Sequence, residues 1–388
     1  MLTLIKNAEI YAPEKLGKTD ILLAGGKIIL LGENIELPER LSAKIIDAEG
    51  LMLTPGFIDA HVHIAGAGGE GGPASRTPEL QLSDMIKAGV TTVVGCLGTD
   101  GITRSVESVL MKVKSLRAEG VSAWMYTGSY QVPTPSITGD IARDITLIEE
   151  VIGVGEVAIS DHRSSVPSVD ELTRITAHAR VAGMIGGKAG IVNIHMGDAK
   201  DPFSPLYRVV ENSELTLRQF LPTHINRNDY IFEDAKKYAM HGYVDITTSS
   251  YPYFPEYEIK PSKALKQLLD AGVPSEHITF TSDACGSLPG FDPVSGELIR
   301  LESGLPSSNL RELRDAVADE KISLETALQV LTSNPARILK LKQKGKIAPG
   351  MDADLLLLDK NFEIHSVFAM GILLLENYIL LKKGAYER

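Results

Sequence analysis

The chain has 388 residues, 44% of them hydrophobic, which is enough for one large core and a second, smaller domain. Its formal net charge of −11 argues against nucleic acid and anionic membranes as partners. Two cysteines, Cys96 and Cys285, are too few for a disulfide framework, which favours a reducing, cytoplasmic location. We expect no secretion signal at the start of the chain, and the leucine-rich stretch near Leu355 is too short to span a membrane.

Both ends of the chain are predicted to be rich in β-structure. Runs of β-branched residues and leucine occupy residues 2–11, 20–31, 44–47 and 345–381. The dipeptide Gly25-Gly26 is typical of a two-residue hairpin turn. Neither end alone makes a complete sandwich, so we expect one small β-sandwich domain formed from residues 1–54 and 345–388 together.

The middle of the chain alternates between strand and helix patterns. The strands expected after the first one, which ends at His63, lie at residues 91–96, 122–127, 154–159, 190–195, 221–224, 243–248 and 278–283. The helices expected between them lie at residues 79–88, 105–118, 142–152, 168–182, 230–240 and 263–271, with two more helical stretches beyond Leu310. Eight strands, each followed by a crossover, favour an α/β fold with a closed (β/α)8 TIM-like barrel over residues 55–344. An open, doubly wound sheet is the alternative.

The first barrel strand carries two histidines one residue apart, in Pro-Gly-Phe-Ile-Asp-Ala-His-Val-His. Side chains at positions i and i+2 of a strand point to the same side, so His61 and His63 could hold one metal ion. The glycine-rich loop that follows cannot be core, and it carries a single acid, Glu70. A surface His-x-His pair is the alternative for the bare motif.

The ends of the later strands carry further groups that could bind a metal ion. In a barrel the active groups lie at the carboxyl ends of the strands. Here those positions hold Tyr130, Glu156, His195, His224 and Asp283. Each alone could be structural, as a core histidine, a turn cap or an outward-facing edge residue. Glu156 lies inside an apolar run, where a carboxylate is costly unless it is paired or ligates a metal.

Four histidines and two carboxylates suit a pair of divalent metal ions. Imidazole and oxygen ligands without a thiolate fit Zn²⁺ best, with Mn²⁺, Co²⁺ and Fe²⁺ as alternatives. Two close ions can polarise a carbonyl and hold a bridging hydroxide. Asp283 would then act as ligand and as proton shuttle between the hydroxide and a leaving amine. The set therefore predicts metal-assisted hydrolysis of an amide-like bond.

Longer motifs accompany these residues over nearly the whole chain. They are Gly-Gly-Glu-Gly-Gly-Pro around Glu70, Cys-Leu-Gly-Thr-Asp at Thr99, Thr-Gly-Ser-Tyr at Tyr130, Ile-Ser-Asp-His-Arg-Ser at Arg163, His-Met-Gly-Asp at His195, Pro-Thr-His-Ile-Asn-Arg-Asn at His224, Ser-Asp-Ala-Cys-Gly-Ser at Asp283, Ser-Asn-Pro-Ala-Arg from Ser333, and Pro-Gly-Met-Asp-Ala-Asp-Leu from Pro349. With the histidine motif, they resemble the amidohydrolase superfamily and, within it, the isoaspartyl dipeptidase family of metallopeptidases.

This resemblance implies hydrolysis of the isopeptide bond of β-aspartyl dipeptides by a metal-bound hydroxide, in a homo-oligomer. Glu70 would hold the free amino group of the dipeptide, and Arg163 and Arg227 its carboxylates. Tyr130 would donate to the oxyanion of the tetrahedral intermediate. The rest of the aspartyl group would be held by Gly68, Thr99 and Ser287. The alternative for each arginine is an ordinary surface salt bridge.

One departure from the resembled family concerns the group that bridges the two metal ions. That family uses a carboxylated lysine on the fourth strand, whereas this chain has Glu156 there, in a stretch one residue longer. We expect Glu156 to bridge without CO₂, helped by a β-bulge at residues 154–157 that Gly155 eases. Two other functions remain open: a cyclic-amide hydrolase for dihydroorotate- or hydantoin-like rings, and a non-catalytic scaffold on the same barrel.

Overall fold

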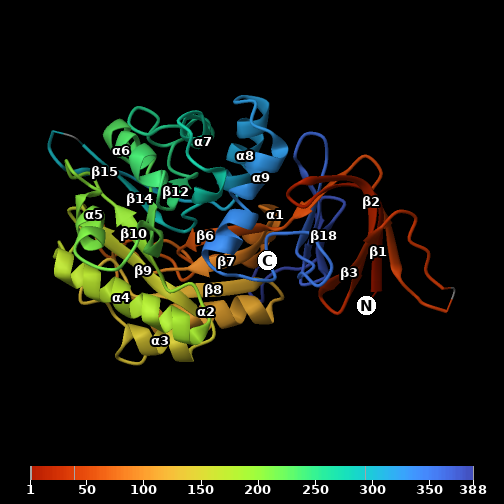
Figure 1. The fold of residues 1–388 in the computed structure, drawn as a ribbon, viewed down its shortest axis with the longest axis horizontal. Coiled ribbons are helices and arrows are strands. Elements are labelled where there is room, and N and C mark those ends of the chain that lie inside the picture. Colours follow the sequence, from red (N-terminus) through yellow and green to blue (C-terminus); the bar gives the residue numbers. More distant parts are fainter. Residues whose placement is uncertain (1, 39, 293, 388) are drawn as a thin grey trace.

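The structure is a computed structural model that describes residues 2–38, 40–292 and 294–387. Strands from the two chain ends, red and blue in Figure 1, lie together at one side of the molecule. The alternating strands and helices of the middle of the chain fill the other side. No helix in the described ranges is long and apolar enough to cross a membrane.

The two chain ends share one hydrogen-bonded sheet. Within the described residues it has nine strands: β1 (Leu2–Tyr11), β2 (Lys15–Ala24), β3 (Lys27–Gly32), β4 (Lys44–Asp47), β5 (Met52–Pro55), β16 (Leu355–Leu358), β17 (Ile364–Ala369), β18 (Ile372–Glu376) and β19 (Ile379–Leu380). The antiparallel pair β5 and β16 joins the ends, with Leu53 opposite Leu357. Gly25 and Gly26 both have positive φ and form the hairpin turn between β2 and β3, as predicted.

The eight expected strands of the middle region are all present among the described residues. They are β6 (Phe57–Val62), β7 (Val90–Gly95), β8 (Ser122–Thr127), β9 (Val151–Ile159), β10 (Ile191–Met196), β11 (Phe220–Thr223), β12 (Val244–Thr247) and β13 (Ile278–Thr281). The first six form one parallel sheet, and β12 and β13 form a parallel pair. Val62 pairs with Ala284 just past β13, and Ile225 past β11 donates to Asp245 of β12. This confirms the α/β class and a curled parallel sheet.

Helices connect these strands and cover the sheet. Their bounds are α1 (Leu82–Lys87), α2 (Val106–Ala118), α3 (Ile141–Leu147), α4 (Val169–Gly186), α5 (Ser204–Glu211), α6 (Asp229–Ala239), α7 (Pro261–Asp270), α8 (Ser308–Ala318), α9 (Leu324–Gln329) and α10 (Ser333–Ile338). The longest, α4, begins with a capping box between Ser168 and Glu171 and ends at Gly187 in the left-handed conformation. Helices α3 and α4 pack against each other, and both lie with α2 below the sheet in the view of Figure 1.

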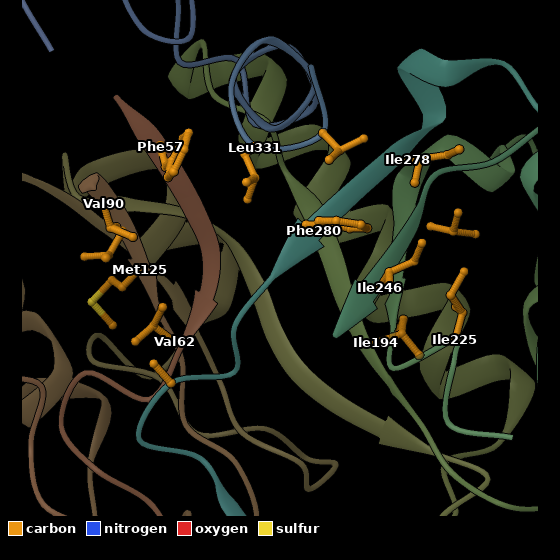
Figure 2. Packing of buried hydrophobic residues seen from close by; sticks show 14 of the residues in the cluster. Phe57, Val62, Val90, Met125, Ile194, Ile225, Ile246, Ile278, Phe280 and Leu331 are labelled. Atoms are coloured by element: carbon orange, nitrogen blue, oxygen red, sulfur yellow. The ribbon is translucent and has the colours of Figure 1, made fainter. Parts of the chain in front are cut away.

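The main apolar core packs between these strands and helices. Figure 2 shows Phe57, Val90 and Met125 of β6, β7 and β8 gathered on one side, and Ile246 and Phe280 of β12 and β13 on the other. All five side chains are fully or almost fully buried. Because such cores are close-packed, the ends of the strands are held at fixed positions.

Three predicted details are wrong. Helix α3 ends at Leu147, and β9 starts at Val151, because Ile148 is already extended and Val151 pairs with Met125 of β8. A hairpin of β14 (Ser287–Phe291) and β15 (Leu298–Ser303) was missed. Three helices rather than two follow residue 307 within the described ranges, because the non-helical Thr332 separates α9 from α10.

Candidate active site

His61 and His63 project from the carboxyl end of β6, which is buried along its whole length. Their rings stand edge to face, with centroids 5.5 Å apart. The Nε2 atom of His61 lies 3.4 Å from Oε2 of Glu156, and Nε2 of His63 lies 3.1 Å from Oδ1 of Asp283. The two histidines therefore face the same point, as the spacing predicts, and Asp283 comes to this point from the loop after β13.

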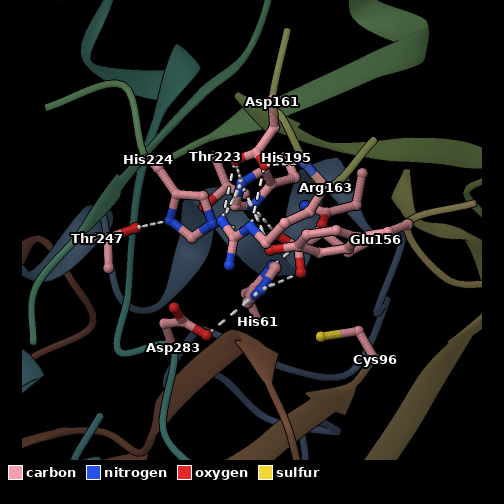
Figure 3. A network of polar contacts seen from close by, with 12 residues as sticks. His61, Cys96, Glu156, Asp161, Arg163, His195, Thr223, His224, Thr247 and Asp283 are labelled. Carbon is pink, nitrogen blue, oxygen red and sulfur yellow. Dashed lines mark hydrogen bonds and ion pairs between the residues drawn. The ribbon is translucent and has the colours of Figure 1, made fainter. Parts of the chain in front are cut away.

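His195 and His224 approach from β10 and from just past β11, and both contact Glu156. Its Oε1 atom lies 2.7 Å from Nδ1 of His195 and 3.1 Å from Nε2 of His224. Its other oxygen, Oε2, faces His61. Figure 3 shows the glutamate carboxylate among the histidines. One oxygen of the Glu156 carboxylate therefore faces the His61–His63 pair, and the other contacts the His195–His224 pair.

A local irregularity in β9 puts Glu156 in this position. Val154 pairs with Val192, but Val157 pairs with Ile194, so β9 contains one residue more than β10 over this interval. At Gly155 a Cβ atom would lie 2.8 Å from Cβ of Asn193, too close for any residue but glycine. The predicted β-bulge at residues 154–157 is confirmed, and glycine is required there because β9 runs close to β10.

Several buried polar atoms at the centre of the cluster have no hydrogen-bond partner among the described residues. They are Nε2 of His61, Oε2 of Glu156 and Oδ1 of Asp283. Buried polar atoms are costly when unsatisfied, and imidazole nitrogens with carboxylate oxygens are typical ligands of divalent metal ions. Two groups of ligand atoms, each within 4.8 Å of one another, could hold an ion: His61, His63, Cys96 and Glu156, and then Glu156, His195 and His224.

The side of each ring that faces away from the centre also has a partner, and these partners were missed in the sequence. Nδ1 of His61 lies 3.0 Å from Oδ1 of Asn193. Nδ1 of His224 lies 2.7 Å from Oγ1 of Thr247, and Nε2 of His195 lies 2.9 Å from Oδ2 of Asp161. Such partners fix the orientation of a histidine that binds a metal. For Asp161 a signal was available, because it lies in the motif that pointed to Arg163.

Burial and neighbouring charges shift the pKa values of the cluster in different directions. Although burial lowers them, the pKa values of His61 and His63 are raised well above the ordinary value by Cys96 with Glu156 and by Cys96 with Asp283, so metal binding must displace their protons. Burial lowers the pKa of His224 to about 4, so its imidazole is neutral and can act as a ligand. Burial alone would raise the pKa of the Glu156 carboxyl, but His61 and His195 hold it well below its ordinary value. Burial raises the pKa of Tyr130 well above its ordinary value, so the phenol keeps its proton.

A cavity of about 520 Å³ opens onto the cluster. Of the residues predicted to bind substrate, its lining includes Glu70, Thr99, Tyr130, Arg163, Arg227 and Ser287. Gly68 lies one residue from Ala67, which does line the cavity. With φ of +98° and no room for a Cβ beside the carbonyl of Ser75, Gly68 is fixed by the turn of its loop.

The polar side of this cavity is built around Arg163. Its guanidinium donates to Asp161 through Nε and Nη2, and Nη1 lies 3.5 Å from Oε1 of Glu70. The other oxygen of Glu70 is buried and has no hydrogen-bond partner within the described part of the chain. Arg227 is more exposed and donates to Asp198 at 3.0 Å. The hydroxyl of Tyr130 lies 2.8 Å from Nδ1 of His195.

The cavity lining also includes apolar side chains that were not predicted. They are Phe254 and Tyr257 from the loop after β12 and Leu288 and Phe291 of the missed β14. The run Tyr-Pro-Tyr-Phe-Pro-Glu-Tyr after β12 is an aromatic cluster in a loop that follows a barrel strand, which is a usable signal. The cavity lining therefore combines charged and aromatic side chains.

Histidines and carboxylates collected at the carboxyl edge of a curled parallel sheet define an α/β protein with a candidate site for divalent metal ions. Amidohydrolase family models match residues 44–99 and 223–374. A beta-aspartyl dipeptidase from Fervidobacterium islandicum AW-1, solved in complex with beta-Asp-Leu dipeptide, is 45% identical, with a TM-score of 0.92. The alignment covers 98% of this chain and 99% of that one. The chain belongs to the amidohydrolase family, and the predicted resemblance to isoaspartyl dipeptidases is confirmed.

More distant relatives share the fold. A dihydroorotase from Elusimicrobium minutum is 26% identical, over 93% of this chain and 89% of its own length. The structure of a D-hydantoinase from Thermus sp. has a TM-score of 0.73 at 17% identity and covers 99% of this chain and 97% of that one. Both identities are well below the 45% identity to the beta-aspartyl dipeptidase, so the cyclic-amide hydrolases match this chain less well.

Proposed function

We propose that this chain is a metal-dependent hydrolase that cleaves the isopeptide bond of β-aspartyl dipeptides. The observation that carries the proposal is the charged part of the cavity lining, formed by Glu70 and Arg163. Beside the histidine cluster, Oε1 of Glu70 lies 3.5 Å from Nη1 of Arg163, and its other oxygen is buried with no hydrogen-bond partner among the described residues. A small zwitterion with an amine near a carboxylate complements this pair. The 45% identity to a beta-aspartyl dipeptidase supports the same substrate.

In this proposal each charged group of the dipeptide has one partner in the cavity. Glu70 accepts from the free amino group, and Arg163 and Arg227 bind the two carboxylates. Thr99 and Ser287 line the cavity next to these residues and hold the aspartyl group. Gly68 contributes by shaping the loop that carries Glu70.

We further propose that two divalent metal ions, preferably Zn²⁺, bind here, with Glu156 as the bridge in place of a carboxylated lysine. The ligands would be His61, His63, Glu156, His195, His224 and Asp283. Support comes from the unpartnered buried atoms and from the two oxygens of Glu156, each of which faces one histidine pair. When bound, such ions act as Lewis acids and lower the pKa of coordinated water.

Two residues of the chain would handle the proton and the charge that hydrolysis generates. Asp283, beside His63 at 3.1 Å, takes the proton from the attacking water and passes it to the leaving amine. Tyr130 keeps its phenolic proton because of burial and donates a hydrogen bond to the oxyanion. Its position 2.8 Å from Nδ1 of His195 keeps this donor beside the cluster.

The same proposal includes the finer organisation of the chain. Residues 55–344 would form a closed (β/α)8 barrel, and residues 1–54 with 345–388 a small β-sandwich. A buried cluster that includes Ile5, Leu53 and Leu357 supports a separate small core. We propose a cytoplasmic homo-oligomer that takes a small dipeptide as its substrate.

The second candidate is a cyclic-amide hydrolase, favoured by the dihydroorotase relative that matches 93% of the chain. A substrate panel separates the two. Metal-loaded protein is assayed on β-Asp-Leu, α-Asp-Leu, β-Glu-Leu, dihydroorotate and a hydantoin. We expect hydrolysis of β-Asp-Leu, with little action on the others. Turnover of a ring substrate in preference to β-Asp-Leu would replace the proposal with the second candidate, and no turnover of any would favour a scaffold.

The role of Glu70 is tested by N-acetylation of the aspartyl amine of β-Asp-Leu. Loss of a hydrogen bond between charged groups costs about 1.5–3 kcal/mol, so kcat/KM should fall about 10–150-fold. The control is acetylated and free substrate with Glu70→Gln, for which the difference should shrink. An unchanged rate for the acetylated substrate with the unmodified protein would exclude Glu70 as the amine-binding group.

A further inference from the structure

Cys96 lies at the centre of the cluster although it has no part in the predicted ligand set. It follows β7 directly, is fully buried, and donates through its backbone N to the carbonyl of Val62 at 3.1 Å. Because β7 pairs with β6, the cysteine stands beside His61 and His63 at the same edge of the sheet. In Figure 3 its sulfur points toward the histidines and carboxylates.

The thiol has only weak contacts in the structure. The sulfur lies 3.7 Å from the carbonyl oxygen of Val62 and 4.0 Å from Nδ1 of His63, the outer limit of a sulfur hydrogen bond. A buried free cysteine commonly acts as a small apolar side chain, and Cys96 does touch an apolar cluster that includes Ile58 and Ala60. That role explains its burial but not a sulfur directed at a polar site.

Ligand geometry gives the sulfur a second role. It lies in a group with His61, His63 and Glu156 whose ligand atoms are all within 4.8 Å of one another. Independently, Nε2 of His61 and Oε2 of Glu156 are wholly buried and have no hydrogen-bond partner in the described residues. These atoms converge on the point that Cys96 also faces, which is the arrangement expected around one ion.

Charge balance favours the same role. Two divalent ions would bring four positive charges into a site whose anionic ligands, Glu156 and Asp283, supply two negative charges. Uncompensated charge is costly where the groups are buried, as both carboxylates are here. A bound hydroxide would supply a third negative charge, and a thiolate at Cys96 would supply the fourth from a residue already in place.

We propose that Cys96 is a thiolate ligand of the metal ion held by His61 and His63, an inference that rests on the proposed metal site. On binding, the S–H bond breaks, a sulfur–metal bond forms, and the proton leaves to solvent. The ligand set on this side of Glu156 is then two imidazoles, one oxygen each from Glu156 and Asp283, and one sulfur. A thiolate favours zinc, cobalt and cadmium over magnesium and manganese, so this residue also selects the metal.

The test uses full-length, metal-free protein loaded with Co²⁺ and read by absorption. Cobalt bound to a thiolate gives a charge-transfer band in the near ultraviolet that imidazole and carboxylate ligands do not give. The sequence contains two cysteines, so the assignment needs one control. We expect the band in the unmodified protein and in Cys285→Ser, and its loss in Cys96→Ser.

The unmodified protein and Cys285→Ser decide the matter even if Cys96→Ser does not fold. A band kept in Cys285→Ser comes from Cys96, whereas its absence from cobalt-loaded unmodified protein overturns the inference. If Cys96→Ser folds, its Cd²⁺ affinity should fall at least about 10-fold, with Mn²⁺ affinity little changed. Since no step uses a substrate, a band without dipeptide hydrolysis would overturn the proposed function and leave this inference standing.

Discussion

The two histidine pairs of the site are built in different ways. His61 and His63 come from one strand, and their common direction follows from the two-residue period of β-structure. His195 and His224 come from neighbouring strands and meet because β10 and β11 pair in parallel, with His195 opposite Thr223. The first pair is a local property of the sequence, and the second depends on the assembled sheet.

The two pairs also differ in what holds them. The outer nitrogen of His195 faces a buried carboxylate, Asp161, which in turn holds Arg163 of the substrate cavity. The outer nitrogen of His61 faces a neutral amide, that of Asn193. The pair made from two strands is therefore connected to the substrate cavity through Asp161, whereas His61 of the local pair is held by a neutral side chain of β10.

The largest effect is expected on the side of the local pair, from Asp283→Ala. Removal of a general base alone typically costs about 10²–10⁴-fold, and a metal ligand is lost with it. We expect kcat on β-Asp-Leu to fall about 10³-fold or more. Metal content is measured on the same sample. A near-normal rate with both ions still bound would exclude the proton-shuttle role.

Glu156→Gln tests whether one carboxylate joins the two pairs. The amide keeps the shape but loses the charge and one acceptor oxygen, so we expect loss of at least one ion and about 10²-fold or more in kcat. Metal analysis after dialysis and steady-state rates provide the readout. If two ions stay tightly bound and turnover is unchanged, Glu156 is not the bridge.

The same comparison predicts independence from CO₂. A carboxylated lysine would need CO₂ for assembly, whereas a glutamate needs none. Metal-free protein reconstituted in bicarbonate-free buffer should therefore recover full activity. The control is a parallel reconstitution with added bicarbonate, which should give the same rate. A clear requirement for bicarbonate would point to a modified lysine elsewhere in the site.

Smaller effects on metal affinity and on KM are expected when the partners of His195 and His224 are changed, in Asp161→Asn and Thr247→Val. Thr247→Val removes the partner of an outer nitrogen and Asp161→Asn removes the charge of one, but only Asp161 also holds Arg163. We expect each to weaken metal binding about 10–100-fold, the range for such partners. Only Asp161→Asn should also raise KM for β-Asp-Leu, because its arginine loses a charged partner. Equal KM changes in the two variants would contradict a connection from His195 through Asp161 to Arg163 in the substrate cavity.

The difference between the pairs also explains what the sequence could predict. The eight strands follow from hydrophobic runs, and the candidate metal ligands follow from their positions at strand ends. Asn193 and Thr247 were not predicted, because a neutral side chain inside a strand has no pattern that marks it as a histidine partner. Their role appears only when β6, β10 and β12 are assembled.

Two other parts of the molecule escaped for different physical reasons. The β14–β15 hairpin carries glycine, proline and charged residues, so its pairing is weakly encoded in local propensity. The sequence does not mark Cys96 as a ligand, because a cysteine at the end of an apolar strand is ordinarily a small core residue. The β-bulge, in contrast, was predicted because a side chain shorter than the expected one needs its strand to move inward.

That bulge offers the most local test, in Gly155→Ala. The added Cβ would lie 2.8 Å from Cβ of Asn193 and 3.2 Å from its carbonyl oxygen, so β9 or β10 must shift. Overpacking of this kind costs about 1–3 kcal/mol in the free energy of unfolding. The shift also moves the adjacent Glu156, so metal affinity should fall with stability. Denaturant unfolding of the metal-free chain and metal competition with a chelator measure the two effects.

Gly32→Ala is the matched control, because it also lies in a strand but away from the site. The nearest neighbour of an added Cβ there is Ile35 at 3.8 Å, an ordinary contact, so the chain should lose no stability and could gain about 0.5–1 kcal/mol. A Gly155→Ala chain as stable as the control, with unchanged metal affinity, would show that β9 can take a side chain at the bulge. Glu156 would then owe its position to its contacts with His195 and His224, and the glycine would be incidental to the bridge.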